Sequence, residues 1–447
     1  MVKSHAVLKT LAIVAAATLV PALPAWSQKK TEDLKRGAAA VQTFLADGIH
    51  VILSPADNEI VSVIVGLEGG FASNETPNPA LTEFTADVIA ASGSGSVSKE
   101  ELRRFLAQSA TSINGGGDYR GLSFSMSTTL PNFDGAWDVL ASMVTDPRFD
   151  PVEYHNLQQR RIAEVKRRWS NPESQASIIA DSLVQLGHPT LGRSITQEDF
   201  EGITIPMMQE FIKRVTERSR ILVVVVGKVT QQEIERKLAA FSSLPPGSYK
   251  PAVMQPQRTA AVPTVVTVDR PGPTTYVRGA FAGPRADDAD YWPLAVGLSH
   301  LRNILFEEVR TKRNLSYAPG SSLTSTLGDS RGVISVSSTL PDSAIVIMLH
   351  ELEKMRNGEI DEQELNNSKQ VYTTAFYMRQ TTNGGLANAL YSAQHNAGNW
   401  KQAFSQDDIA AVNRAGVQRA FEKYARNLQF GIVGNQAKVT RDRYVFR

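Results

Sequence analysis

The 447-residue sequence predicts an α+β protein made of two duplicated domains, each an antiparallel-rich sheet with helices packed on one face. Three observations predict this class: a proline-rich break near the middle, segments that recur in both halves, and strand patterns that alternate with long helical patterns. The length agrees, because about 420 residues exceed one ordinary hydrophobic core.

The break lies at residues 244–263. Its prolines disfavour regular structure, so we interpret it as an interdomain linker between an N-terminal domain, residues 28–243, and a C-terminal domain, residues 264–447. The prolines are Pro245, Pro246, Pro251, Pro256 and Pro263.

Three segments of the first half have counterparts in the second half, in the same order. Residues 125–131 read S-M-S-T-T-L-P and residues 335–341 read S-V-S-S-T-L-P, each a strand pattern that ends at proline. A helix start at Asp150 recurs at Asp361, and a strand that ends in Val-Gly recurs near the end of each half. The spacings are 210, 211 and 207 residues, which predicts duplicated domains rather than a short-period solenoid.

Within each half, alternating apolar residues predict strands and longer periodic stretches predict helices. The expected strands include 61–67, 122–128 and 333–340, and the expected helices include 99–108, 151–168 and 361–378. Runs of strands followed by runs of helices favour antiparallel sheets that carry helices on one face.

The first 27 residues are typical of a secretory signal peptide. Lys3, His5 and Lys9 make a basic start, and residues 11–20 form an apolar core that is too short to span a bilayer. Small residues at positions 25 and 27 fit cleavage before Gln28. We therefore expect a secreted chain, in a bacterial periplasm, with no membrane span after signal removal.

Charge and cysteine content exclude several classes of function. Removal of residues 1–27 leaves 45 basic and 45 acidic residues, whereas a nucleic-acid partner requires a clustered basic surface. The basic run at 160–168 carries Glu164 at helical spacing, and we interpret it as a solvated helix face. The sequence has no cysteine, which excludes disulfides, thiolate metal sites and a cysteine nucleophile.

A helix expected at residues 80–89, A-L-T-E-F-T-A-D-V-I, follows the strand at 61–67. In an inverted zinc-peptidase motif, H-x-x-E-H, two histidines bind the metal and the glutamate activates water. The three corresponding positions hold Glu83, Ala86 and Asp87. The helix therefore lacks the residues that this chemistry needs.

With this helix and two further segments, nearly the whole mature chain resembles the M16 (pitrilysin or insulinase) peptidases, in particular the two-domain M16B subunits. Residues 187–192, G-H-P-T-L-G, are similar to the family's G-x-H-P-x-G stretch. Residues 305–317, L-F-E-E-V-R-T-K-R-N-L-S-Y, are similar to its L-F-x-E-x-R-x-K-x-x-L-x-Y segment. The resemblance implies two M16-type domains, of which the first carries a degenerate zinc site.

The resemblance also implies where the third zinc ligand would lie. The family places a glutamate about 77 residues after the second histidine, and counting from Asp87 leads to Glu164. Glu83, Asp87 and Glu164 would form a cluster of three carboxylates, which suits hard cations better than zinc. Ala86 cannot accept a proton from water, so the general base is missing. We therefore expect no cofactor on this chain and zinc on a partner subunit.

Arg310 and Tyr317 match the residues that hold the substrate carbonyl and stabilise the oxyanion in the family. In heterodimeric M16B enzymes one subunit brings zinc and the other brings this pair, and the chain resembles the second kind. The resemblance thus implies a non-catalytic, substrate-binding subunit. Its partners would be a catalytic M16 subunit with an intact H-x-x-E-H motif and a peptide or unfolded protein.

Residues 114–118, N-G-G-G-D, allow two interpretations. The favoured one is a flexible turn before the strand at 122–128. In the other, Gly115, Gly116 and Gly117 lie beside the edge strand on which M16 enzymes bind extended peptides, and let the substrate approach closely.

Two alternatives to the heterodimer remain open. The chain is a catalytically dead peptide-binding or scaffold protein of the cell envelope, or it is an active enzyme with unusual ligands. The second alternative predicts stoichiometric zinc in the pure chain.

Overall fold

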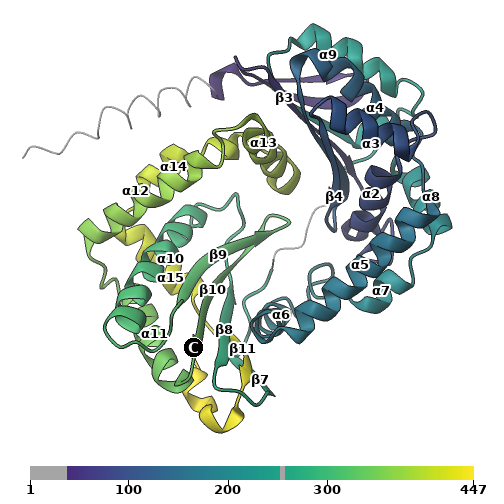
Figure 1. The fold of residues 1–447 in the computed structure, drawn as a ribbon. Helices are drawn as coiled ribbons and strands as arrows, with labels where there is room; N and C mark the ends of the chain where they lie inside the picture. Colours follow the sequence, from purple (N-terminus) through teal and green to yellow (C-terminus); the bar gives the residue numbers. More distant parts are fainter. Residues whose placement is uncertain (1–37, 252–256) are drawn as a thin grey trace, which may run out of the picture.

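The computed structural model describes residues 38–251 and 257–447, so the expected signal peptide at residues 1–27 lies outside the described residues. The described chain forms two halves, each built on one β-sheet, that face each other (Figure 1). The α+β class with two sheets is confirmed.

The first sheet has six strands in the order β1-β2-β6-β3-β5-β4. All neighbouring strands pair antiparallel except β2 and β6, which are parallel. Its strands are β1 (Gln42–Ala46), β2 (Ile49–Pro55), β3 (Ile60–Glu68), β4 (Ser112–Gly117), β5 (Gly121–Thr129) and β6 (Ile221–Gly227). Within the described residues, this order leaves β4 with one unpaired edge.

The second sheet repeats this order without a counterpart of β1. It runs β7-β11-β8-β10-β9, and its single parallel pair, β7 with β11, matches β2 with β6. Its strands are β7 (Thr264–Asp269), β8 (Thr275–Ala282), β9 (Gly320–Thr326), β10 (Asp329–Ser338) and β11 (Gln429–Gly434). The repeated strand order confirms the duplication that the sequence spacing predicts.

Helices follow corresponding strands in each half, although the first half has additional helices such as α3 and α9. The first half carries α2 (Leu81–Ser92), α3 (Lys99–Gln108), α4 (Phe133–Thr145), α5 (Pro151–Ser170), α6 (Pro172–Val184), α7 (Gln197–Glu201), α8 (Ile205–Val215) and α9 (Gln231–Leu238). The second half carries α10 (Tyr291–Leu305), α11 (Pro341–Arg356), α12 (Glu362–Met378), α13 (Asn383–Ala397), α14 (Gln406–Ala411) and α15 (Arg414–Tyr424). The duplicated helix starts have matching caps, because Asp150 and Asp361 each accept backbone N–H groups of the following turn.

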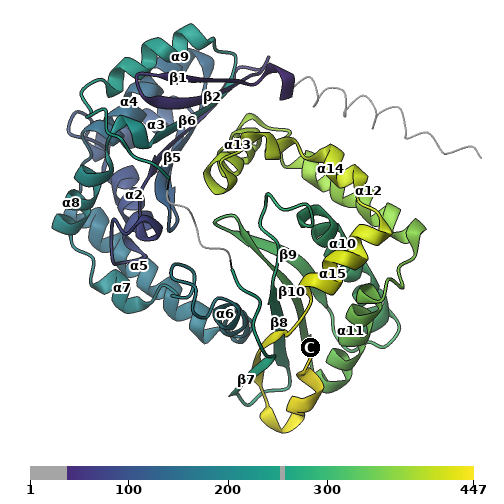
Figure 2. The same ribbon diagram turned by 180° about the vertical axis from the view of Figure 1, so that it is seen from behind.

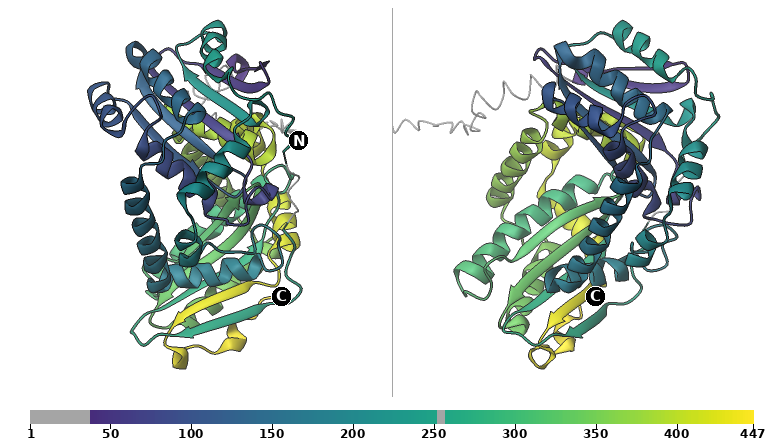
Figure 3. Two further views of the ribbon diagram at one scale, coloured as in Figure 1. Left: turned by 90° about the vertical axis from the view of Figure 1, so that its right-hand side faces the viewer. Right: turned by 45° about the vertical axis from the view of Figure 1, so that its right-hand side comes forward.

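Each sheet has helices of its own half on one face and one helix of the other half on the second face (Figures 1 and 2). Helix α13 packs on the first sheet, where Leu390 and Ala387 join a buried cluster with Ile52 and Val224. Helix α6 packs across β8 and β11 of the second sheet, as the turned views in Figure 3 show. Each half keeps a main core of its own, and two smaller buried clusters join the halves, which the expectation of helices on one face did not include.

A buried histidine of α13 forms ion pairs with two carboxylates of the first half. His395 is 5% exposed and lies between Glu68 of β3, at 2.6 Å from Nδ1, and Asp118, at 3.0 Å from Nε2. Its ring stacks on Tyr391, one turn earlier in the same helix. Burial alone would lower the pKa of His395, but the two carboxylates raise it to about 10. The contact is therefore charged at neutral pH.

The predicted linker at residues 244–263 spans the gap in the described residues. Those of its residues that the structure describes form no helix or strand, and its exact limits stay a prediction. No described helix is long and apolar enough to cross a membrane.

Candidate site at the degenerate zinc motif

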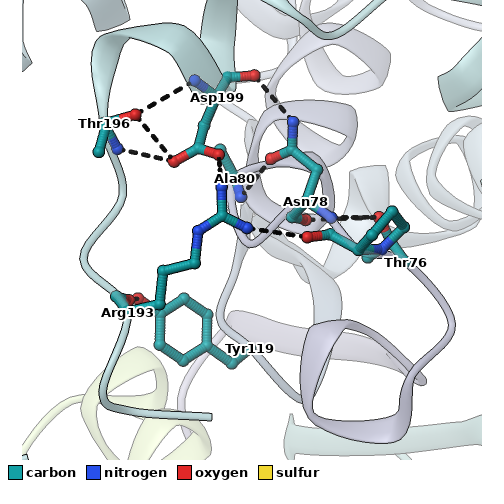
Figure 4. A network of polar contacts seen from close by, with 8 residues as sticks. Thr76, Asn78, Ala80, Tyr119, Arg193, Thr196 and Asp199 are labelled. Carbon is teal, nitrogen blue, oxygen red and sulfur yellow. Dashed lines mark hydrogen bonds and ion pairs between the residues drawn. The ribbon is translucent and has the colours of Figure 1, made fainter. Parts of the chain in front are cut away.

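Helix α2, which carries Glu83, Ala86 and Asp87, packs over β4 and β5 with an apolar face that includes Phe84 and Val88. A polar network fixes its start (Figure 4). Asn78 accepts the backbone N–H of Ala80 at 2.9 Å, and its amide donates to the Asp199 carbonyl at 2.8 Å. The motif residues are therefore held on a rigid element.

The structure brings Glu83, Asp87 and Glu164 together around one side chain, Arg161 of α5. Arg161 Nη2 donates to Glu83 Oε1 at 2.7 Å, and Nε and Nη2 donate to Asp87 Oδ2 at 2.9 and 2.5 Å. Arg161 Nη1 donates to Glu164 Oε2 at 3.2 Å. A guanidinium thus lies at the centre of the three carboxylates.

Burial raises the pKa of Glu83 and of Asp87, and Arg161 opposes this effect in both cases. Burial would also lower the pKa of Arg161, but the hydrogen bonds and charges of Asp87 and Glu83 outweigh it and raise that pKa above its usual range. Arg161 therefore stays charged and acts as the counter-ion of the cluster.

The donor set does not fit a catalytic zinc ion. It contains no imidazole, and its carboxylate oxygens already hold a fixed cation. A metal ion would have to displace Arg161. Within residues 38–251 and 257–447, no group of three or more His, Asp or Glu side chains has the geometry to hold a metal.

The interpretation of residues 160–168 as a solvated helix face is wrong for Arg161. This side chain is three-quarters buried between α5 and α2. The sequence did indicate the pair of Arg161 with Glu164, which lie three residues apart on one helix face. Only the packing of α5 on α2 shows that Glu83 and Asp87 are partners of Arg161 as well.

The three glycines lie in the edge strand β4, so the favoured interpretation as a flexible turn is wrong for them. A Cβ at Gly115 would lie 2.1 Å from the carbonyl oxygen of Ala86, and one at Gly117 would lie 3.2 Å from the Cα of Glu83. Gly116 faces open space, with no atom within 4 Å of its Cβ position. Two of the glycines therefore let α2 approach β4 closely.

Arg310 and Tyr317 form a stacked pair at the end of α10. Arg310 lies in a π-helical turn, Phe306–Thr311, and its guanidinium carbon is 4.1 Å from the Tyr317 ring centroid and 4.6 Å from that of Phe306. Tyr317 is 78% exposed. Among the described residues no hydrogen bond or ion pair joins this pair to Glu83, Asp87 or Glu164.

The G-H-P-T-L-G segment forms a turn between the two halves. His188 Nδ1 accepts the backbone N–H groups of Thr190 and Leu191 at 3.1 and 2.9 Å. Its Nε2 lies 3.8 Å from Asp329 of β10, which belongs to the second sheet. The segment therefore has a structural role at the junction of the halves.

Comparison with known proteins agrees with this architecture. Residues 202–372 match the family model described as peptidase M16 inactive domain, and no curated protein sequence matches the chain. The structure resembles the peptidase M16 inactive domain from Pseudomonas fluorescens with a TM-score of 0.79 at 16% identity, covering 88% of this chain and 98% of that chain.

Two further solved structures share the fold at 16% identity. The periplasmic protease PqqL from Escherichia coli gives a TM-score of 0.74, covering 89% of this chain and 45% of that chain. A protease from Helicobacter pylori also gives 0.74, covering 88% and 99%. The chain thus spans less than half of PqqL and nearly all of the Helicobacter protein.

The fold is similar to that of M16-type structures, and in it an arginine joins the three carboxylates that the sequence motif marks as candidates. The family match assigns residues 202–372, less than half of the chain, to the M16 inactive domain, and the described fold as a whole is similar to M16-type structures; both support a non-catalytic M16-like protein. The match to the inactive domain fits a chain without catalytic zinc of its own.

Proposed function

We propose that the protein is the substrate-binding subunit of an exported heterodimeric zinc peptidase. It supplies Arg310 and Tyr317 to an active site whose zinc lies on a catalytic M16 partner with an intact H-x-x-E-H motif. The substrate is a peptide or an unfolded segment of protein, and the compartment is the bacterial periplasm.

The observation that carries the proposal is the contrast between the two sites on this chain. Arg161 fills the cluster at the zinc-ligand positions with a permanent internal cation. Arg310 has no hydrogen bond or ion pair from its side chain within the described residues, and it stacks beneath an exposed tyrosine. A guanidinium and a phenol presented together can donate to a carbonyl oxygen that gains negative charge.

The β4 edge supports the peptide-binding part. Its outer edge pairs with no other described strand, and the face of β4 to which a Gly116 side chain would point is open. An extended peptide can add to such an edge through backbone hydrogen bonds, which tolerate many sequences.

The test is to co-purify or reconstitute the chain with a zinc-bearing M16 protein from the same organism and measure peptide cleavage. The proposal expects activity in the mixture only, with zinc bound by the partner. In that complex, Tyr317→Phe lowers turnover about tenfold or more, because an oxyanion donor is lost.

Tyr249→Phe is the matched control, since Tyr249 also stacks on an arginine, Arg220, at 4.1 Å. It is expected to leave turnover unchanged. Equal kinetics for Tyr317→Phe and the native complex would remove the proposed role of Tyr317.

A peptide-binding or scaffold protein of the cell envelope is the second candidate. The exchanged helices α6 and α13, which make one packed unit of the two halves, favour it. It predicts that the chain forms no active complex with any M16 partner. Stoichiometric zinc in the pure chain would contradict both candidates.

A further inference from the structure

A cavity of about 600 Å³ lies beside Glu83, between the two halves. Its walls come from α5 and α6, from the turn after β4, and from the end of the β9–β10 hairpin. Trp169 and Ile178 give it apolar surface, and Tyr119 closes another side. Concave sites with apolar walls and a few fixed polar groups are where proteins bind ligands.

One wall of the cavity carries a buried arginine whose hydrogen-bond donors are not all satisfied. Arg331 of β10 is 8% exposed, and its Nε has no hydrogen-bond partner among the described residues. Its Nη2 donates to Thr326 at a long 3.4 Å, and its Nη1 donates to the side-chain oxygen of Gln185. Burial lowers the pKa of Arg331, as expected for a cation that lacks full compensation.

The carboxylates near Arg331 are shared with other arginines. Asp181 of α6 has to balance two guanidiniums, since its Oδ1 lies 3.7 Å from Arg331 Nε and 3.5 Å from Arg278 Nε. That oxygen makes no hydrogen bond in the described structure. Asp329 of β10 also acts electrostatically on Arg331, but it lies 3.3 Å from Arg285, so both carboxylates near Arg331 serve a second arginine.

Most other charged groups of the cavity wall have partners of their own. Glu83 is bound to Arg161 and Asp118 to His395. Arg193 is paired with Asp199, as Figure 4 shows. The remaining charged side chains of the wall, Arg168 and Glu173, have opposite signs.

The cavity also continues the free edge of the first sheet. Gly117, the last residue of β4, lies in the cavity wall. A peptide that pairs with the β4 edge therefore reaches the cavity at its end, with Trp169 and Ile178 available to a terminal side chain.

We propose that this cavity binds a carboxylate of an extended peptide through Arg331, so that peptides on β4 are held by an acidic end. The two possible sources are the free carboxyl terminus and an Asp or Glu side chain near it. The inference rests on the proposed peptide binding at β4, and arginine is suited to it because its planar donors match a carboxylate.

The test measures the affinity of the purified full chain for fluorescent peptides of one sequence. One peptide ends in a free carboxylate, a second in an amide, and a third in an amide with glutamate as its last residue. The expected result is binding about tenfold or more tighter for a peptide with a carboxylate than for the neutral amide, as a charge-assisted hydrogen bond provides. Tighter binding of the peptide with a free carboxyl terminus alone identifies the terminus as the ligand. Equally tight binding of the amidated peptide that ends in glutamate identifies the side chain.

Equal affinity for all three peptides overturns the carboxylate site while leaving peptide binding intact. No binding of any peptide overturns the proposed peptide binding itself. A second comparison uses Arg331→Gln, which is expected to remove the preference for carboxylates but not the binding of the amide. Arg220→Gln, a buried arginine outside the cavity, is the matched control and keeps the preference.

Discussion

At the scale of single residues, the main feature is the pairing of three carboxylates with one internal cation, Arg161. Glu83 and Asp87 keep negative charge at the positions of two histidines, and Arg161 provides the compensating positive charge. Partly buried carboxylates need such compensation, because an unpaired buried charge costs several kcal/mol. Arg161 thus supplies from the chain itself the positive charge that the three carboxylates need.

Arg161→Gln is expected to lower the free energy of unfolding by about 1–3 kcal/mol, because three partly buried carboxylates lose their counter-ion and the cluster remains partly open to water. Urea unfolding at neutral pH measures the change. The exposed Arg167→Gln on the same helix is the control and should be near neutral. Equal stability of the two variants would show that the cluster contributes nothing.

At the scale of elements, the sequence pattern located many helices and strands closely. The helix expected at 99–108 is α3, and the strand expected at 122–128 is β5 with one residue more at each end. The glycine-rich stretch was misinterpreted because glycine usually marks turns, whereas here α2 lies so close that Gly115 and Gly117 have no room for side chains. Such an approach between distant segments has no local signal.

Gly115→Ala is expected to destabilise the protein by about 1–3 kcal/mol, because the new methyl group meets the Ala86 carbonyl and overpacks the contact of α2 with β4. Gly116→Ala on the same strand is the matched control, since its Cβ would meet open space. Thermal and urea unfolding of both variants test this. The contact is not tight if both variants unfold at the same urea concentration.

At the scale of the whole molecule, exchange of α6 and α13 joins the two halves into one folding unit. Each of these helices covers the sheet of the other half, and His395 adds a buried charged contact to Glu68 and Asp118. The relative placement of the degenerate site and the Arg310–Tyr317 pair is therefore set by packing rather than by the linker.

The pH dependence of stability tests this junction. The folded-state pKa of His395, about 10, lies above its usual value of 6.5, so protonation favours the folded state. The contribution is complete below pH 6.5 and is lost as pH rises from 6.5 towards 10. Native protein should therefore exceed His395→Gln in stability by on the order of a few kcal/mol at pH 6, with the gap shrinking towards pH 10.

Unfolding of both proteins in urea at pH 6, 8 and 10 measures that gap. His155→Gln, at an exposed histidine of α5, should show no such pH-dependent difference. A constant gap between native protein and His395→Gln across this range would contradict a charged His395.

The sequence by itself determined the α+β class, the duplication, the loss of the H-x-x-E-H residues and the candidate positions Glu164, Arg310 and Tyr317. These follow from periodicity, spacing and motif, which act along the chain. Only the tertiary structure decided that Arg161 holds the carboxylates, that β4 is a free edge leading to a cavity with Arg331, and that helices cross between halves. Each of these depends on side chains from distant segments meeting in space, where burial and charge balance select the partner.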